Sequence, residues 1–137
     1  MNLEDTNKWE NHIKQFNIEA LLMAEAERDL VRATIRGFSR SIILWLVSQK
    51  PMSGYAIVKE MKRLTGQHFH SGVIYPLLYE LEENELIAGK WIERGRRRIK
   101  RYAVTEKGTK MLNHIRELFE MPVRKVLKDL INEASSE

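Results

Sequence analysis

Two short β-prone runs interrupt a sequence that otherwise has a helical pattern. Residues 89–93 and 99–104 flank a polar tip at residues 94–98, which contains Gly95. Two such runs around a glycine-containing tip predict one β-hairpin. The fold is therefore expected to be mainly α with a small β-hairpin.

Apolar residues recur at helical spacing on both sides of this hairpin. The N-terminal third reads as helix, with neither glycine nor proline before Gly37, and a buried helix is expected over about residues 38–48. Ser53 is the expected N-cap of a helix that ends near residue 64, where a Thr-Gly pair stops it. A further helix opens at Ser71 and runs to about Asn84, because Pro76 fits only near a helix start.

A long helix is expected at the C-terminal end, over residues 106–133, with Thr105 as its cap and a kink or split at Pro122. At about 1.5 Å per residue it would be roughly 42 Å long, more than one small domain can cover. Its heptad-like apolar stripe either packs on its own domain or forms a seam between two copies, and we favour the homodimer. The expected interface residues are Leu21, Leu22, Met111, Leu112, Ile115, Leu118, Phe119, Val123, Leu127 and Leu130.

Helices followed by a two-stranded hairpin make a winged helix-turn-helix, whose third core helix enters the major groove while the hairpin, or wing, reaches backbone or minor groove. The chain then divides into an N-terminal helical arm (1–35), the winged helix-turn-helix (36–104) and a C-terminal dimerisation helix (105–137). Both flanking segments are read as dimerisation helices.

Positive charge is concentrated in the middle of the chain. Residues 1–35 hold four basic and seven acidic residues, residues 36–104 hold thirteen and six, and residues 105–137 hold six of each. A basic central domain points to a polyanionic partner for that domain. The chain has no cysteine, no apolar run long enough for a membrane span and no visible secretory signal, so a cytoplasmic protein is expected.

Six cations lie within eight residues at the expected wing: Arg94, Arg96, Arg97, Arg98, Lys100 and Arg101. A solvated hairpin tip is the simpler interpretation. Cations at this density repel one another, however, and we therefore favour contact with nucleic acid, with an affinity that falls steeply with salt.

Three stretches resemble the PadR-like family of winged-helix transcriptional regulators. They are residues 50–57 (KPMSGYAI), residues 71–83 (SGVIYPLLYELEE) and residues 96–108, where a wing leads into TEKG. Val73 stands where the family usually has Thr, and Asn84-Glu85 where it usually has Glu-Gly, which puts a turn on Asn84. The resemblance implies a homodimer on a palindromic operator, repression as the usual outcome and, in several members, a small hydrophobic effector.

The expected recognition helix supplies further candidate contacts. Tyr75 and Tyr79 share one helix face and either pack in the core or contact DNA. Ser71 and Gly72 at its start, like Ser53, Gly54 and Tyr55 at the start of the preceding helix, either cap the helix, bind phosphate, or do both.

This helix has no Arg or Gln with which to read base edges, and its only Asn lies at the C-terminal end. We therefore expect specificity to depend on DNA shape and on wing arginines in the minor groove.

No constellation of catalytic residues, metal ligands or cofactor-binding residues appears at a meaningful spacing, so we expect neither an enzyme nor a bound metal or cofactor. His68 and His70 alone would make a weak metal site, and loop packing explains them better. The expected fold and the distribution of charge thus favour a sequence-specific DNA-binding transcriptional regulator that acts as a homodimeric repressor. A winged-helix module for protein partners and an RNA-binding winged helix stay open as alternatives, because fold alone does not decide function.

Overall fold

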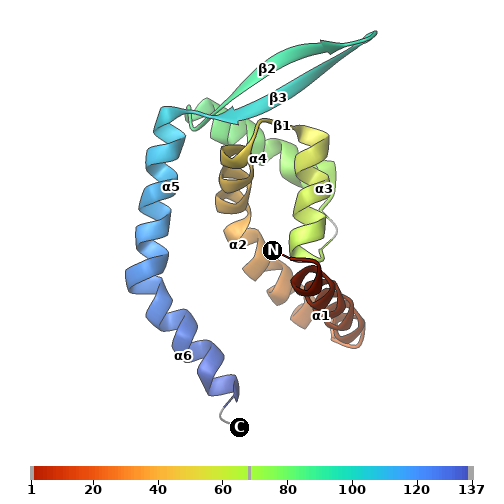
Figure 1. Cartoon of the computed structure of the whole chain (residues 1–137). Coiled ribbons are helices and arrows are strands. Elements are labelled where there is room, and N and C mark those ends of the chain that lie inside the picture. The colour runs from red at the N-terminus through yellow and green to blue at the C-terminus, as the bar shows by residue number, and fades with distance from the viewer. Residues whose placement is uncertain (1, 68, 136–137) are drawn as a thin grey trace.

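The computed structural model describes residues 2–67 and 69–135, so His68 lies outside the described part. The helices and strands follow one another as α1 (Leu3–Leu21), α2 (Glu25–Gln49), β1 (Met52–Ser53), α3 (Gly54–Thr65), α4 (Ser71–Glu83), β2 (Ile87–Arg94), β3 (Arg97–Val104), α5 (Glu106–Leu118), a π-helical segment (Phe119–Val123) and α6 (Arg124–Ser135). The expectation of a mainly helical fold with a small hairpin is confirmed. In Figure 1 the hairpin lies across the top, and α5 and α6 descend on the side opposite α1.

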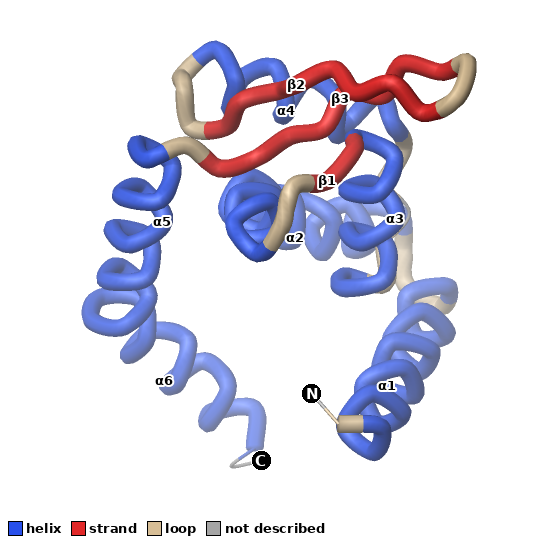
Figure 2. The backbone as a smooth tube through the Cα atoms, turned by 45° about the horizontal axis from the view of Figure 1, so that its top comes forward, coloured by secondary structure: helices blue, strands red, loops and turns tan. Residues whose placement is uncertain are grey.

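The sheet has three antiparallel strands in the order β1-β3-β2, seen side by side in Figure 2. Arg94 pairs with Arg97, so the hairpin closes through Gly95 and Arg96 alone. Gly95 has φ 61°, the positive value that a type II′ turn requires at its first position. The predicted five-residue tip was therefore too long, because both strands continue into it. β1, which joins the hairpin by pairing Met52 with Tyr102, was not predicted.

The hydrophobic core lies between α2, α3, α4 and the inner end of the hairpin. Its buried helical side chains follow the helical periodicity of the sequence, and the sheet adds three buried residues from one face, Met52, Ile87 and Tyr102. The largest fully buried side chains are those of Ile43, Leu44, Ile57, Met61, Ile74, Leu78 and Ile87. The core thereby fixes α4 beneath the hairpin.

The first two helices differ from the prediction. The helical conformation is interrupted at residues 22–24, between α1 and α2. α2 begins at Glu25 and passes through Gly37 without interruption, so the expected helix start near Phe38 was wrong. Ala24 has an extended backbone, and its N–H donates to the Glu27 carboxylate at 3.2 Å. A single glycine costs a helix only about 1 kcal/mol, which its helix-forming neighbours offset. α2 also crosses the predicted boundary between residues 35 and 36, and the three-part division stays a prediction.

Helix caps agree well with the sequence. Ser53 accepts the Ala56 N–H at the start of α3, Gly66 ends α3 at φ 68°, and Thr105 accepts the Gly108 N–H at the start of α5. The turn after α4 was placed wrongly. Asn84 has φ −81°, whereas Glu85 has φ 60° and is the one non-glycine residue with a positive φ in the part of the chain described.

The C-terminal helix is divided at Pro122, as expected. Proline lacks an N–H and clashes with the preceding turn, so the backbone widens into a π-helical segment before α6 begins. Within that segment Phe119 contacts Phe38 of α2, with ring centroids 5.6 Å apart. Over residues 2–67 and 69–135, no helix combines the length and apolar character that crossing a membrane requires.

Candidate nucleic-acid interface

Glu82 near the end of α4 joins this helix to both strands of the hairpin. Its Oε2 accepts the Gly89 N–H of β2 at 2.8 Å, and its Oε1 pairs with the Lys100 Nζ of β3 at 2.8 Å. A Cβ at position 89 would collide with the Lys100 and Glu82 side chains, so only glycine leaves room for the pair. α4 and the hairpin therefore form one joined unit.

The ion pair stabilises the charged form of both partners. The hydrogen bond from Lys100, together with the one from the Gly89 N–H, lowers the pKa of the Glu82 carboxyl below its ordinary value. The hydrogen bond to Glu82 likewise raises the pKa of Lys100. Burial raises the pKa of the neighbouring Tyr102 hydroxyl. Glu82 and Lys100 are thus both charged across the neutral range.

Three aromatic rings surround the Lys100 ammonium. Its Nζ lies 5.3 Å from the ring centroid of Tyr102, 5.9 Å from that of Trp91 and 6.0 Å from that of Tyr79. These distances are within the range of cation–π attraction. The predicted DNA contact of Lys100 stays a prediction, and the structure gives this side chain a set of partners within its own chain.

Strand alternation divides the basic run between the two faces of the hairpin. Arg98 and Lys100 share the face of Trp91 and Tyr102, and the Arg98 guanidinium lies 5.1 Å from the Trp91 ring centroid. Arg94, Arg97 and Arg101 occupy the other face, because successive residues of a strand point to opposite sides. Arg96 lies in the turn between the strands.

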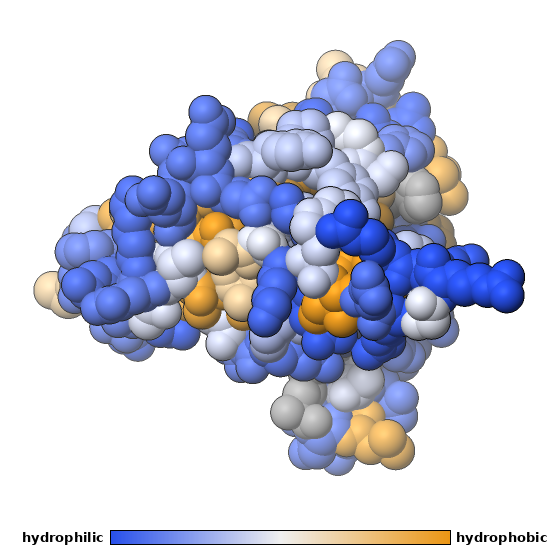
Figure 3. Space-filling view, turned by 90° about the horizontal axis from the view of Figure 1, so that it is seen from above, coloured by the Kyte–Doolittle hydropathy of each residue, from blue (hydrophilic) through white to orange (hydrophobic). Residues whose placement is uncertain are grey.

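The outer end of the hairpin is the most strongly cationic part. Arg94, Arg96, Arg97 and Arg98 are exposed, and none of them pairs with a carboxylate of the described residues. Arg101, nearer the core, is half-buried and lines a groove of about 620 Å³ between the hairpin and α3. Seen from above, this side of the molecule is largely hydrophilic, with hydrophobic residues in separate patches (Figure 3). The exposed arginines are therefore available to an external anion.

The starts of α3 and α4 meet at Tyr75. A Cβ at Gly54 would lie 2.7 Å from the Tyr75 hydroxyl oxygen, so the ring rests against the glycine at the start of α3. Tyr75 is 38% exposed, so its ring packs against the protein on one side and leaves another part accessible to a partner. Tyr55 and Tyr79 are far more open, at 76% and 67%.

The start of α4 is where the sequence placed it, but its cap is different. His70 occupies the N-cap position and its carbonyl accepts the Val73 N–H at 2.9 Å, so Ser71 is the first helical residue and not the cap. Ser71 and Gly72 are exposed, and a Cβ at Gly72 would meet no atom within 4 Å. Their predicted phosphate contact stays a prediction.

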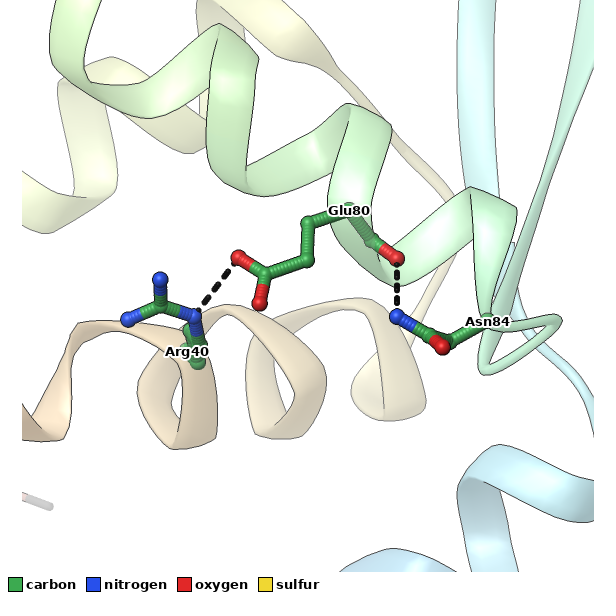
Figure 4. A network of polar contacts seen from close by, with 3 residues as sticks. All are labelled: Arg40, Glu80 and Asn84. Atoms are coloured by element: carbon green, nitrogen blue, oxygen red, sulfur yellow. Dashed lines mark hydrogen bonds and ion pairs between the residues drawn. The ribbon is translucent and has the colours of Figure 1, made fainter.

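A second ion pair holds α4 from the side of α2. Arg40 Nε donates to Glu80 Oε2 at 2.8 Å, and the Asn84 side chain donates to the Glu80 carbonyl at 2.8 Å, as Figure 4 shows. Two of the three glutamates in the second half of α4, Glu80 and Glu82, are thus matched by cations. An acid-rich helix becomes compatible with a polyanionic partner, because among these three glutamates only Glu83 is exposed and makes no ion pair with the described residues.

The predicted interface residues fall into three groups by exposure, and their role between two copies stays a prediction. Leu112 is buried in the core of its own chain, and Ile115 packs against that core. Half-buried residues recur at every fourth position along the C-terminal helical segment, at Ile115, Phe119, Val123 and Leu127. Exposed members are Leu21, Leu22, Met111, Leu118 and Leu130, and Met121, Val126 and Ile131 extend the exposed apolar set.

Glu82, Gly89 and Trp91 were not among the predicted site residues. An isolated glycine inside a strand marks a close approach, and this signal was available for Gly89. Trp91 could have been assigned to the face of Lys100 once the two-residue turn was recognised. Nothing local in the sequence distinguishes Glu82 from its glutamate neighbours.

Comparison with known proteins agrees with this geometry. The family model described as "Transcriptional regulator PadR-like family" matches residues 43–114. The transcriptional regulator YqjI of Escherichia coli is 37% identical over 87 residues, which are 62% of this chain and 41% of that protein. The chain thus spans about two fifths of the length of the curated relatives it matches.

Solved structures give the same result. A PadR-like transcriptional regulator from Bacillus cereus is 25% identical with a TM-score of 0.65, and the match covers 72% of this chain and 96% of that one. A PadR family transcriptional regulator from Eggerthella lenta is 28% identical with a TM-score of 0.61, covering 78% and 97%. With its family match extending over more than half of the sequence, this chain belongs to the PadR-like family of transcriptional regulators.

Proposed function

We propose that this regulator is a homodimeric, sequence-specific DNA-binding repressor. In this proposal α4 docks in the major groove from Ser71 onward, and the wing at residues 94–101 lies on the backbone or in the minor groove. The observation that carries the proposal is the junction at Glu82, which joins α4 to a hairpin whose outer arginines are exposed and without ion-pair partners among the described residues.

The face next to the recognition helix supports this mode of binding. Tyr79 of α4 and Trp91 of β2 both lie within about 6 Å of the Lys100 ammonium, so the exposed rings belong to one surface. Four exposed arginines at the outer end of the hairpin, of which Arg98 shares that face, would contact phosphates or enter a narrow minor groove. Protein–DNA contacts of this kind position the protein, and sequence-dependent DNA shape adds specificity.

Dimerisation is supported by the two ends of the chain. Leu22 is 84% exposed and Leu130 63%, and apolar residues of this size are rarely left as a continuous open surface on a soluble monomer. Pairing through a two-fold axis would place two copies of α4 on successive major grooves, about one helical turn apart. A palindromic operator follows from that symmetry.

A gel shift with the DNA that flanks the chain's own coding region tests the proposal. The wild-type protein should bind at low salt, and its affinity should fall steeply at higher salt. Replacing Arg94 and Arg96 with Ala should weaken binding and lower the salt slope of the dimer by up to about 3.6, since its two protomers lose four phosphate contacts and each contact contributes about 0.9. Arg63→Gln is the matched control, because Arg63 pairs with Glu60 on α3 and should leave binding unchanged.

Three results would contradict the proposal. Absence of a shift at low salt would exclude operator binding, and a shift equal to that of random DNA at every salt would exclude sequence specificity. Sedimentation as a monomer at concentrations that saturate the DNA would exclude the homodimer. Repression is tested separately by transcription in vitro from the shifted promoter, where added protein should lower the yield of transcript.

A further inference from the structure

A hollow beside the start of α4 is lined by three arginines of one helix. It has a volume of about 610 Å³ and lies between α1, α2 and the chain that leads from α3 into α4. Arg28, Arg32 and Arg36 line it from α2. Their spacing of four residues places them on one helix face, where like charges repel.

The charges in this hollow are poorly matched within the chain. The Nε atom of Arg28 is buried and meets no hydrogen-bond acceptor in the described part of the protein. Arg32 pairs with Asp29 at 3.1 Å, whereas no carboxylate lies within ion-pair distance of Arg28 or Arg36 across residues 2–67 and 69–135. The described lining residues include no carboxylate at all. A buried guanidinium donor without an acceptor is costly, and an anion would supply the acceptor.

The remaining walls combine apolar and polar side chains. Leu21 from α1, Ile35 from α2, Phe69 from the loop and Val73 from the first turn of α4 are the apolar ones, and the polar ones are Asn17, Gln67 and His70. The volume is in the range of pockets that hold small molecules. Contact with a DNA backbone would need only an exposed cationic strip, whereas apolar walls around guanidinium groups suit a compact molecule with one anionic end.

We propose that this hollow binds a small organic anion, a phosphate or carboxylate attached to an apolar body. The guanidinium groups of Arg28 and Arg36 hold the anionic group, and Ile35, Phe69 and Val73 enclose the apolar part. This binding does not depend on the proposed DNA recognition, since it is measured on the protein alone.

Equilibrium dialysis of the full chain against 1-naphthyl phosphate tests the proposal, with 1-naphthylmethanol as the neutral counterpart. We expect saturable binding of one phosphate ester per chain and much weaker binding of the alcohol. Arg28→Gln and Arg36→Gln should each raise the Kd about tenfold, which is the effect of losing one charge-assisted hydrogen bond. Arg63→Gln, a change of equal charge on α3, should leave the Kd unchanged.

The variants are designed so that folding and binding are separated. Arg36 is exposed, so Arg36→Gln tests the site even if Arg28→Gln loses its fold, and far-UV circular dichroism identifies that case. The proposal is overturned if the ester shows no saturable binding up to millimolar concentration, if the alcohol binds equally well, or if Arg36→Gln binds like the wild type. DNA binding tests the other source of phosphate. If the double variant Arg28→Gln/Arg36→Gln lowered the salt slope of DNA binding by about 0.9 for each arginine lost, these arginines would contact the DNA backbone, and the small-molecule site would be refuted.

Discussion

The substitution Glu82→Gln tests whether the wing is held in place by α4. Glu82 makes one charge-assisted bond to Lys100 and one bond to the Gly89 N–H, both at 2.8 Å. A hydrogen bond to a charged group contributes about 1.5–3 kcal/mol to stability. The two side chains are about a quarter exposed, which screens the pair, and glutamine retains one neutral hydrogen bond. The expected net loss is therefore about 1–1.5 kcal/mol.

That loss should appear in DNA binding as a decrease. A change of about 1.4 kcal/mol shifts the equilibrium between joined and detached wing tenfold, so affinity should fall by up to tenfold if DNA requires the joined form. Simple charge arithmetic predicts the opposite, because the substitution removes a negative charge near a polyanion. Glu83→Gln is the matched control: Glu83 is exposed and adjacent, and its neutralisation should raise affinity about twofold, from about 0.4 kcal/mol for charges ~10 Å apart in water.

The assay is fluorescence anisotropy with a labelled operator duplex at two salt concentrations. Opposite signs for Glu82→Gln and Glu83→Gln support the joined wing. If both variants bind more tightly and to the same degree, Glu82 acts only as a charge, and the reasoning from its hydrogen bonds is wrong.

The pH dependence of stability gives an independent check on the same pair. Since the pKa of Glu82 is lowered in the folded protein, its contribution is complete above the ordinary glutamate value of about 4.3 and is lost as the pH falls through the folded value. Since the pKa of Lys100 is raised, its contribution is complete below about 10.4 and is lost as the pH rises through its folded value. The difference in free energy of unfolding between wild type and Glu82→Gln should be constant between about pH 5 and 9 and should shrink in acid.

Three further predictions use other parts of the molecule. Glu85→Gly should stabilise the protein by about 1 kcal/mol in thermal unfolding, because glycine removes the cost of φ 60°, whereas Glu83→Gly at the last residue of α4 relieves no such cost and should not stabilise it; equal stabilisation by both would contradict the backbone argument. Gly54→Ala should displace the Tyr75 ring at a cost of about 1 kcal/mol and weaken operator binding in the gel shift; unchanged affinity would show that the ring position is irrelevant to DNA. Arg97→Ala should weaken binding and reduce discrimination between A·T-rich and G·C-rich flanks in a binding titration; unchanged discrimination would exclude shape readout through Arg97.

Local sequence signals predicted those elements whose ends are determined by their own residues. Ser53, Gly66 and Thr105 cap or end helices as expected, because an N-cap hydroxyl or a left-handed glycine acts within one turn of itself. Pro122 divides the last helix for an equally local reason. The periodicity of α3 and α4 placed Ile57, Ile74 and Leu78 in the core.

Features that depend on a distant partner were missed. β1 has two residues, too few for a period, and it exists as a strand only through its pairing with Tyr102 and Arg101. The break at residues 22–24 contains neither glycine nor proline. Glu85 adopts a positive φ where the chain turns from α4 into the hairpin, and there the Thr105 hydroxyl donates to its carbonyl at 2.6 Å. The resemblance to the family marked this turn but not which of its two residues would adopt the left-handed form.

The wing shows how one missed detail changes a functional interpretation. As a sequence, residues 94–101 form one basic run, and its six cations look equivalent. Once Gly95 and Arg96 are known to close the hairpin, alternation assigns Lys100 to the face of α4 and Arg97 to the opposite face. Lys100 then balances Glu82 within the chain, while the exposed arginines keep their charge for a partner. Charge density alone therefore overstates the number of cations that a wing offers to DNA, and the register of the hairpin decides which of them remain available.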